Sequence, residues 1–310
     1  MAQRPAPPPP TITEAELLPR LDAFVASAAT PLVVITGPTA SGKTVLSIRL
    51  AQRLGGEVIN GDSRQFYRGM DLGTAKVTEA EMAGVPHHLL SFLEPDAAFT
   101  VAEFKEQAEA AIRATLARGH VPLLVGGSGL FLDAICKNLS IPRVPPQPAF
   151  RATLAEVPTT ELFARLEAID PESAAMATQH DRVRLIRTLE IAAFTGEQPS
   201  ALKRQAPCAW DVFKIGIWVD PAELDARIAA RTEAIWQAGF LDEVRALQAQ
   251  GHDEHTPALI AHGYREAIAH LRGELTAERA KELMTRNTRR YAKRQRTWWR
   301  RDTEMVWVEV

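Results

Sequence analysis

A glycine-rich phosphate-loop pattern constrains the fold of this chain more than any other sequence feature. The pattern GxxxxGK[ST] is satisfied by Gly37, Pro38, Thr39, Ala40, Ser41, Gly42, Lys43 and Thr44. An apolar stretch from residue 32 predicts a strand before the loop, and residues 43–54 predict a helix after it. In that context a chance match in an ordinary turn is the weaker interpretation. The loop predicts a site for a diphosphate or for a nucleotide such as ATP.

Further elements predict the fold class. Residues 57–60 and the apolar run 121–125 predict two short strands, and a capping box of Thr100 and Glu103 opens a helix that reaches residue 118. Strands that alternate with helices favour a parallel sheet. We therefore expect an α/β fold, a P-loop NTPase-like parallel sheet flanked by helices, with an all-helical insertion and a helical C-terminal region.

Proline and helical patterns predict the domain organisation. Prolines at 142, 145, 146 and 148 break the α/β pattern, and residues 150–205 are typical of helices without a strand. Residues 213–219 then alternate like a strand that returns to the sheet. We expect a proline-rich tail with a short helix (1–30), the first part of the P-loop core (31–140), a helical insertion (141–205), and a return strand with C-terminal helices (206–310).

Composition limits the classes of protein. The net charge of −2 gives no overall attraction to nucleic acid, so any such contact must come from a local patch. Cys136 and Cys208 form no CxxC pair, which argues against a zinc ribbon and a disulfide framework and favours a reducing cytosol. The apolar runs are too short for a membrane span, and the N-terminus lacks the pattern of a signal peptide. We expect a cytoplasmic protein without a membrane partner.

A carboxylate after the second strand is the candidate general base. In nucleotide hydrolases of this class a carboxylate at the end of a buried strand usually holds the metal, but residues 121–125 end in Gly126, Gly127 and Ser128. Asp62 follows residues 57–60 instead, and ligands of parallel sheets lie at the carboxyl ends of the strands. Asp62 should therefore face the phosphate loop. The alternative is an aspartate that caps a turn.

Nine blocks of sequence, in one order, resemble a known family. They are GPTASGKT (37–44), DSRQFY (62–67), GMDLGTAK (69–76), PHHL (86–89), LLVGGSGLF (123–131), DRVRLIRTLE (181–190), RIAAR (227–231), GYRE (263–266) and AKRQRTW (292–298). Together they resemble the bacterial type of tRNA dimethylallyltransferases, also called tRNA isopentenyltransferases. Several ordered blocks are more specific than the phosphate loop alone.

The resemblance implies a reaction and roles for residues. Dimethylallyl would move from dimethylallyl diphosphate to N6 of the adenosine 3′-adjacent to the tRNA anticodon, with Mg²⁺ and with Thr44 as its protein ligand. The phosphate loop would hold the donor's diphosphate, Asp62 would be the general base, and Thr39 and Arg231 would stabilise the leaving group. Expected contacts with tRNA are Asp62, Ser63, Arg64, Gln65, Gly129, Arg184, Arg187, Tyr264, Arg265, Lys293, Arg294, Arg296 and Arg300. The expected state is a monomer.

A basic stripe near the C-terminus favours RNA independently. Eight basic side chains fall within sixteen residues, without an acidic one, at positions 286, 289, 290, 293, 294, 296, 300 and 301. On a helix they occupy an arc of about 160°. The competing interpretation is a solvated face. A prenyltransferase that acts on free AMP or ATP, a small-molecule kinase and a non-catalytic RNA-binding module remain the alternative functions.

Overall fold

The computed structural model describes residues 8–202 and 207–310. Residues 1–7 of the predicted tail and residues 203–206 at the end of the predicted insertion lie outside the described residues. The chain forms two compact units: Met1–Leu132 with Ala209–Val310, and Asp133–Cys208. Among the described residues, no helix is both long and apolar enough to cross a bilayer.

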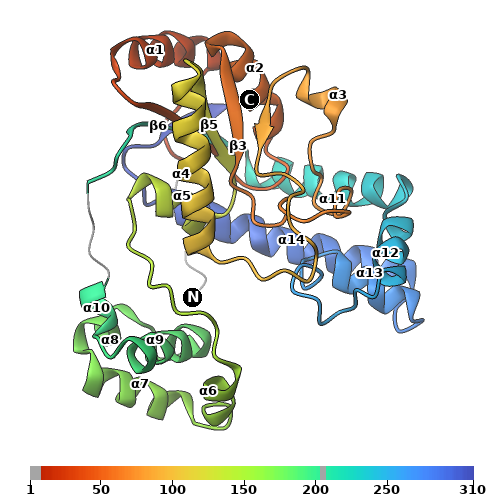
Figure 1. Cartoon of the computed structure of the whole chain (residues 1–310). Coiled ribbons are helices and arrows are strands. Elements are labelled where there is room, and N and C mark those ends of the chain that lie inside the picture. Colours follow the sequence, from red (N-terminus) through yellow and green to blue (C-terminus); the bar gives the residue numbers. More distant parts are fainter. Residues whose placement is uncertain (1–7, 203–206) are drawn as a thin grey trace. The chain divides into compact units, whose positions relative to one another are not determined.

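A parallel sheet organises the first unit (Figure 1). Its seven strands follow the order β1-β7-β6-β2-β5-β3-β4, and every pair is parallel. Their bounds are β1 (Thr11–Ile12), β2 (Pro31–Thr36), β3 (Gly56–Asn60), β4 (His87–His88), β5 (Val121–Gly126), β6 (Asp211–Trp218) and β7 (Val306–Glu309). The α/β class with a parallel sheet, predicted from the sequence, is confirmed.

Helices flank this sheet. They are α1 (Glu14–Ser27), α2 (Lys43–Leu54), α3 (Glu79–Met82), α4 (Val101–Ala117), α11 (Pro221–Gln237), α12 (Phe240–Ala249), α13 (Tyr264–Leu271) and α14 (Ala277–Trp299), while α5 (Gly129–Cys136) leads into the second unit. Capping boxes at Thr13, Thr78 and Thr100 start α1, α3 and α4. Leu17, Val33 and Leu46 belong to the core between sheet and helices.

Three short strands were missing from the prediction. β1, β4 and β7 have two, two and four residues, too few for a period of two to be visible. β7 is fixed by its neighbour β6, and its Trp307 and Val308 are buried. Pairing over a long sequence distance defines these strands, which a local pattern does not reveal.

The second unit is helical and has its own core. It contains α6 (Pro148–Thr153), α7 (Thr159–Ile169), α8 (Pro171–Met176), α9 (Arg182–Thr195) and α10 (Pro199–Leu202). Leu162, Leu166 and Leu185 are fully buried within it. Asp170 is also buried, and its carboxylate accepts bonds from the backbone N–H groups of Ser173 and Ser200. The unit is therefore a packed helical body that contains a buried, hydrogen-bonded carboxylate.

Glu57 anchors the first residues of β3. Its carboxylate accepts bonds from Arg118 Nε (3.0 Å) and Thr115 Oγ1 (3.2 Å) and lies 2.6 Å from His88 Nε2. The Arg118 bonds are the largest cause that lowers the pKa of Glu57 to about 2. His88, whose role the sequence left open, thus pairs with Glu57, and His87 contacts the carbonyl of Val85 at 2.8 Å.

We predict that Glu57→Gln lowers the free energy of unfolding by about 1–3 kcal/mol at neutral pH, because Arg118, His88 and the buried Thr115 lose a charged acceptor. The folded-state pKa of Glu57 is about 2 and its ordinary value is 4.5, so its stabilisation is complete above pH 4.5 and is lost as the pH falls toward 2. Urea unfolding of both proteins should show a difference that shrinks in acid. Glu109→Gln, on the surface of α4, is the control and should change stability by less than about 0.5 kcal/mol. If the difference in unfolding free energy between the wild type and Glu57→Gln stayed the same in acid, the stabilising role of the Glu57 carboxylate would be contradicted.

Candidate active site

The carboxyl ends of three neighbouring strands bring the predicted site residues together. In the parallel register Thr36 of β2 lies opposite Gly126 of β5, and Asn60 of β3 lies opposite Val125. The loops that follow these strands therefore leave the sheet at one edge. The backbone of Gly61 comes so close to Gly126 that an added Cβ there would lie 2.4 Å from it, so only glycine fits.

The phosphate loop connects β2 to α2. Two of its residues have positive φ, Ala40 (63°) and Gly42 (92°), and Lys43 begins the helix. Lys43 Nζ donates to the carbonyls of Gly37 (3.1 Å) and Pro38 (2.8 Å). Ser41 Oγ is buried without a partner among the described residues. The loop thus combines a helix N-terminus, a lysine and unsatisfied polar capacity, which suits a phosphate anion.

Asp62 lies beside this loop, two residues beyond β3. The side chain of Asn60 holds it: Asn60 Oδ1 accepts from Asp62 N–H (2.9 Å), and Asn60 Nδ2 donates to Asp62 O (3.2 Å). Asp62 Oδ1 also accepts from the N–H of Arg64 at 3.0 Å. Asp62 therefore also caps a turn, as the alternative interpretation expected. This cap uses only part of the carboxylate's capacity to accept hydrogen bonds.

One cavity of about 280 Å³ connects these elements within the first unit. Its polar lining comes from Thr39, Asp62, Ser63, Arg64, Thr74, Arg231, Thr232, His262, Thr288, Tyr291 and Arg294. Its apolar lining comes from Ile228, Ile235, Ile260, Ala261, Tyr264 and Met284, with Gly73 beside them. The three residues predicted to be catalytic, Thr39, Asp62 and Arg231, thus share one cavity.

Three charged side chains in this region influence one another. Burial is the main cause that lowers the pKa of Lys43 to about 8, while the charge of Asp62 raises it and that of Arg231 lowers it. Burial likewise lowers the pKa of Arg231, against the opposing effect of Asp62. Burial and then the Asp62 charge raise the pKa of Tyr291. The site is a partly desolvated group of two cations and one carboxylate, in which an added anion interacts strongly.

Gln295 is a site residue that the sequence analysis missed. This buried side chain of α14 accepts from the N–H of Thr39 (2.9 Å) and donates to the carbonyl of Gly127 (3.0 Å). It therefore joins the phosphate loop to the loop after β5. Its position inside the block AKRQRTW was visible, but among basic neighbours a neutral amide gave no signal of a role.

The remaining predicted residues of the first unit lie in varied settings. Ser63 and Arg64 line the cavity, whereas Gln65 Nε2 donates to the carbonyls of Thr74 and Ala75 (3.3 Å each). Tyr264 also lines the cavity, but its ring is fully buried and its hydroxyl is bonded to a carboxylate of the protein. Arg265 is exposed. Contact with RNA stays a prediction for all of them.

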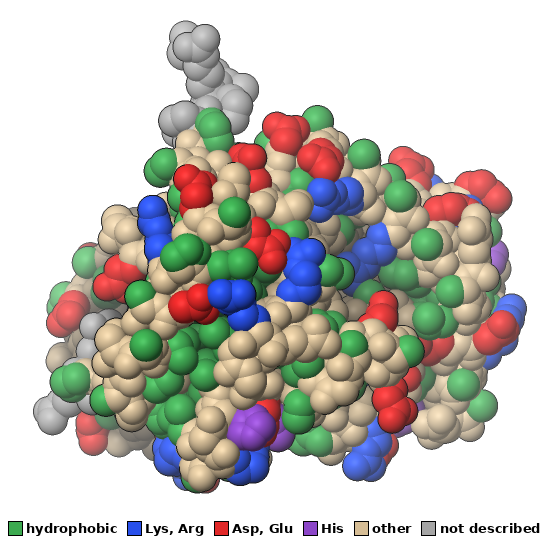
Figure 2. Space-filling model, turned by 90° about the horizontal axis from the view of Figure 1, so that it is seen from above, with side chains coloured by type: hydrophobic (Ala, Val, Ile, Leu, Met, Phe, Trp, Pro, Cys, Tyr) green, Lys and Arg blue, Asp and Glu red, His purple; other side chains and the backbone are tan. Residues whose placement is uncertain are grey.

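Six of the eight basic residues of the predicted stripe lie on α14, which ends before Arg300 and Arg301, and they differ in exposure. Arg290 and Lys293 are exposed, whereas Arg296 is partly buried over the ring of Trp218, 5.1 Å from its centroid. Arg300 lies over the same ring at 5.6 Å, and Arg294 lies over Tyr291 at 5.6 Å. The face drawn in Figure 2 has acidic and basic side chains interspersed, in keeping with the net charge of −2. Any attraction to RNA therefore has to be local.

Two further packing details concern α14. The two tryptophans at its end differ, since Trp299 is buried but Trp298 is 40% exposed. An added Cβ at Gly129, predicted to contact tRNA, would lie 2.6 Å from the Trp298 ring, so α5 begins directly against this ring. Trp298 therefore covers the start of α5 while part of it stays exposed.

In the second unit, the two predicted arginines differ. Arg184 has an exposed side chain (59%). Arg187 instead pairs with the buried Glu190 at 2.5 Å and donates to the carbonyl of Val144. Arg151 pairs with the same carboxylate at 2.7 Å. The structure gives Arg187 a stabilising role within the unit, and its contact with tRNA stays a prediction.

The fold and the cavity define a class: a P-loop-type α/β protein in which a phosphate loop, a carboxylate and an aliphatic pocket meet, an arrangement suited to group transfer from a diphosphate. Comparison with known proteins identifies the family. The model of the IPP transferase family matches residues 65–302. The tRNA dimethylallyltransferase of Symbiobacterium thermophilum is 45% identical, over 90% of this chain and 89% of its own.

Other relatives and solved structures agree. The tRNA dimethylallyltransferase of Anaeromyxobacter sp. is 46% identical, over 89% of this chain and 92% of its own. The crystal structure of a tRNA isopentenylpyrophosphate transferase from Bacillus halodurans superposes with a TM-score of 0.69, 38% identity and 90% coverage of both chains. A eukaryotic dimethylallyltransferase acting on tRNA gives a TM-score of 0.78 at 26% identity, over 91% of this chain and 74% of its own. The chain belongs to the IPP transferase family.

We predict that Lys43→Met weakens binding of inorganic pyrophosphate about tenfold to hundredfold at neutral pH, since a charge-assisted bond is lost. Because the pKa of Lys43 is lowered to about 8, the lysine is charged below that pH and loses its charge above it. The ratio of the two affinities should therefore fall as the pH rises beyond 8. Calorimetry measures this ratio, in which the titration of pyrophosphate itself cancels. A ratio independent of pH would show that Lys43 does not act as a titrating cation.

Proposed function

We propose that this protein is a tRNA dimethylallyltransferase, which transfers dimethylallyl from its diphosphate to N6 of the adenosine 3′-adjacent to the anticodon and releases diphosphate. The observation that carries the proposal is the shared cavity of Thr39, Asp62 and Arg231. The relatives' names give tRNA and the prenyl group, and the resemblance of the sequence blocks implies the acceptor atom. The residues that line the cavity can be assigned to the steps of this reaction.

The composition of the cavity wall suits the prenyl donor. Ile228, Ile235 and Met284 present aliphatic surface of the kind that accepts a five-carbon branched chain. The phosphate loop, whose Thr39 lies in the same wall, offers N–H groups and a lysine to the diphosphate. The aliphatic residues would thus contact the prenyl chain of the donor, and the phosphate loop would bind its diphosphate.

Stabilisation of the leaving group is assigned to the two cations. Breaking the allylic carbon–oxygen bond leaves the electron pair on the diphosphate, so donors already fixed in place lower the barrier most. Lys43 and Arg231 are partly desolvated, which strengthens their interaction with that charge. Thr39, held by Gln295, is assigned to the same task.

Asp62 is assigned the role of general base, which accepts the proton that adenine N6 loses. Adenine N6 is a weak nucleophile, because its lone pair is delocalised into the ring, and it must lose a proton as the carbon–nitrogen bond forms. The backbone N–H of Arg64 donates to Asp62 Oδ1, and this hydrogen bond fixes the orientation of the carboxylate. The base must leave the stack of the anticodon loop to reach this cavity, as in other enzymes that modify bases.

Mg²⁺ is part of the proposal. Thr44 follows Lys43 at the exposed first turn of α2, and its hydroxyl is the hard oxygen ligand that this ion prefers. The residues present therefore fit a cation bound mainly by the oxygens of the donor's diphosphate, with Thr44 as the protein ligand. The ion would supply charge neutralisation on the departing diphosphate.

The exposed cations of α14 are proposed to bind the RNA backbone. Arg290, Lys293 and Arg294 lie within two helical turns, and Arg294 also lines the cavity. Phosphates bound there would hold the anticodon stem-loop next to the cavity entrance. Arg184 in the second unit is a further proposed contact. For the oligomeric state we propose a monomer, and for the localisation the cytosol.

We predict that Asp62→Asn lowers kcat by about 10²–10⁴-fold, the usual contribution of general base catalysis. Binding of tRNA should change little, because asparagine keeps the acceptor for the N–H of Arg64. The measurement is the mass of nucleosides from unmodified tRNA incubated with dimethylallyl diphosphate and Mg²⁺. Asp96→Asn, an exposed carboxylate elsewhere, is the matched control.

The same assay separates the alternatives. Prenylation of AMP but not of tRNA would indicate an adenylate prenyltransferase, and transfer of a γ-phosphate would indicate a kinase. An unmodified tRNA in the presence of every substrate would overturn the proposal.

We predict that Arg290→Ala combined with Lys293→Ala weakens tRNA binding and reduces the slope of log K against log salt by roughly 1 to 2, because up to two phosphate contacts are lost. kcat at saturating tRNA should stay unchanged. Filter binding over a salt series measures the slope, and Arg113→Ala, at an exposed position of α4, is the control. Equal slopes for the double variant and the wild type would place the RNA elsewhere.

A further inference from the structure

A loop without regular secondary structure forms part of the cavity wall. Residues 70–76 contribute Gly73 and Thr74 to the lining, and the carbonyl of Thr74 accepts a bond from Arg231 Nη2 at 3.5 Å. The position of this loop therefore affects the shape of the cavity and the direction of Arg231.

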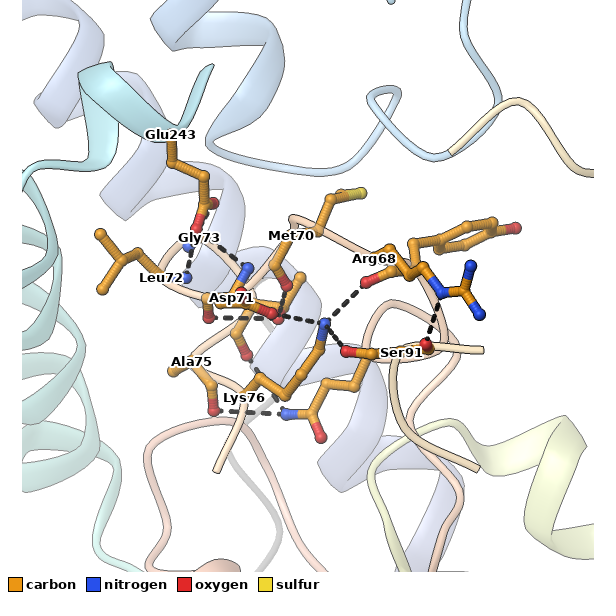
Figure 3. A network of polar contacts seen from close by, with 12 residues as sticks. Arg68, Met70, Asp71, Leu72, Gly73, Ala75, Lys76, Ser91 and Glu243 are labelled. Carbon is orange, nitrogen blue, oxygen red and sulfur yellow. Dashed lines mark hydrogen bonds and ion pairs between the residues drawn. The ribbon is translucent and has the colours of Figure 1, made fainter. Parts of the chain in front are cut away.

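One carboxylate from a distant helix holds the loop (Figure 3). Glu243 of α12 accepts three successive backbone N–H groups, from Asp71 (2.9 Å) and Leu72 (2.6 Å) on Oε2 and from Gly73 (3.1 Å) on Oε1. Oε1 also accepts from the hydroxyl of Tyr264 at 2.6 Å. Four donors on one ionised side chain form a strong, directional clamp.

The surroundings of the clamp keep these roles fixed. Burial, followed by the charge of Glu243, raises the pKa of Tyr264 well above its ordinary value, so the phenol stays a donor. An added Cβ at Gly73 would lie 2.5 Å from the rings of both Phe240 and Tyr264, so the loop backbone packs directly against them. The clamped segment has no room to move toward α12.

A second set of bonds holds the other side of the loop. Lys76, whose side chain is 6% exposed, donates to the carbonyl of Tyr67 (2.6 Å), to Asp71 Oδ1 (2.7 Å) and to Ser91 Oγ (2.8 Å), as Figure 3 shows. Removing Glu243 would thus leave a loop that is still anchored at Lys76 but has lost its hold at residues 71–73.

We propose that Glu243 is a positioning residue of the prenyl transfer: it fixes residues 71–74 and, through the carbonyl of Thr74, orients Arg231 toward the diphosphate. The inference rests on the proposed function for the identity of the donor. Glu243 lies outside the cavity lining and acts on it through the loop backbone and the guanidinium, while its bond to Tyr264 holds a further lining residue.

The test is a double-mutant cycle between Glu243→Gln and Arg231→Gln, read as affinity for inorganic pyrophosphate with Mg²⁺ by calorimetry and as kcat in the prenylation assay. A glutamine offers one acceptor oxygen where two carboxylate oxygens serve four donors, so the clamp loosens while the side chain keeps its size. We expect Glu243→Gln to weaken pyrophosphate binding about tenfold in the wild type and hardly at all in the Arg231→Gln background. KM for tRNA should stay unchanged.

Asp242→Asn is the matched control, since it removes one exposed charge from the adjacent position of α12 and should leave both measurements as in the wild type. Additive losses in the cycle would show that Glu243 does not act through Arg231 and would overturn the proposal. Amide hydrogen exchange keeps the test decisive if a variant folds poorly. Fast exchange of the N–H groups of Asp71, Leu72 and Gly73 in the wild type would equally refute the clamp.

The measurements of pyrophosphate binding and of hydrogen exchange do not depend on the prenyl-transfer activity. Failure of the wild type to prenylate tRNA would therefore count against the proposed function, whereas additivity or fast exchange would count against the role of Glu243.

Discussion

The close approach of Gly61 to Gly126 is the contact on which the site depends. A side chain at Gly126 would meet the backbone of Gly61 at 2.4 Å, so the chain leaving β3 and the chain leaving β5 touch without an intervening side chain. Gly127 comes next, and there an added Cβ would lie 2.0 Å from Gln295 Nε2. Two glycines thus allow α14 to reach the loops at the edge of the sheet, and Gln295 extends this contact to Thr39. The phosphate loop and the basic helix consequently share one rigid connection.

The parts of this arrangement that could be predicted are those coded by neighbouring residues. The phosphate loop, the capping box at Thr100 and the strand before Asp62 each depend on residues a few positions apart, and the predicted elements are present. Glu243 and Gln295 hold loop backbone that lies 168 or more positions away, and nothing in their own neighbourhood marks them. Arg187 shows a different limit: the family resemblance implied that it contacts tRNA, whereas in the structure it pairs with the buried carboxylate of Glu190, three positions further on.

Both ends of the short strand β3 are held by polar side chains, which bears on how Asp62 could work. Glu57 ties the beginning of the strand to Arg118 of the segment after α4 and to His88 of β4. Asn60 ties its end to the backbone of Asp62 and to the carbonyl of Leu89. In the role proposed for it, Asp62 would have little freedom to follow a substrate. In the proposed mechanism this preorganisation would lower the reorganisation needed during the reaction, and the acceptor adenine would have to be brought to the carboxylate by contacts with the rest of the RNA.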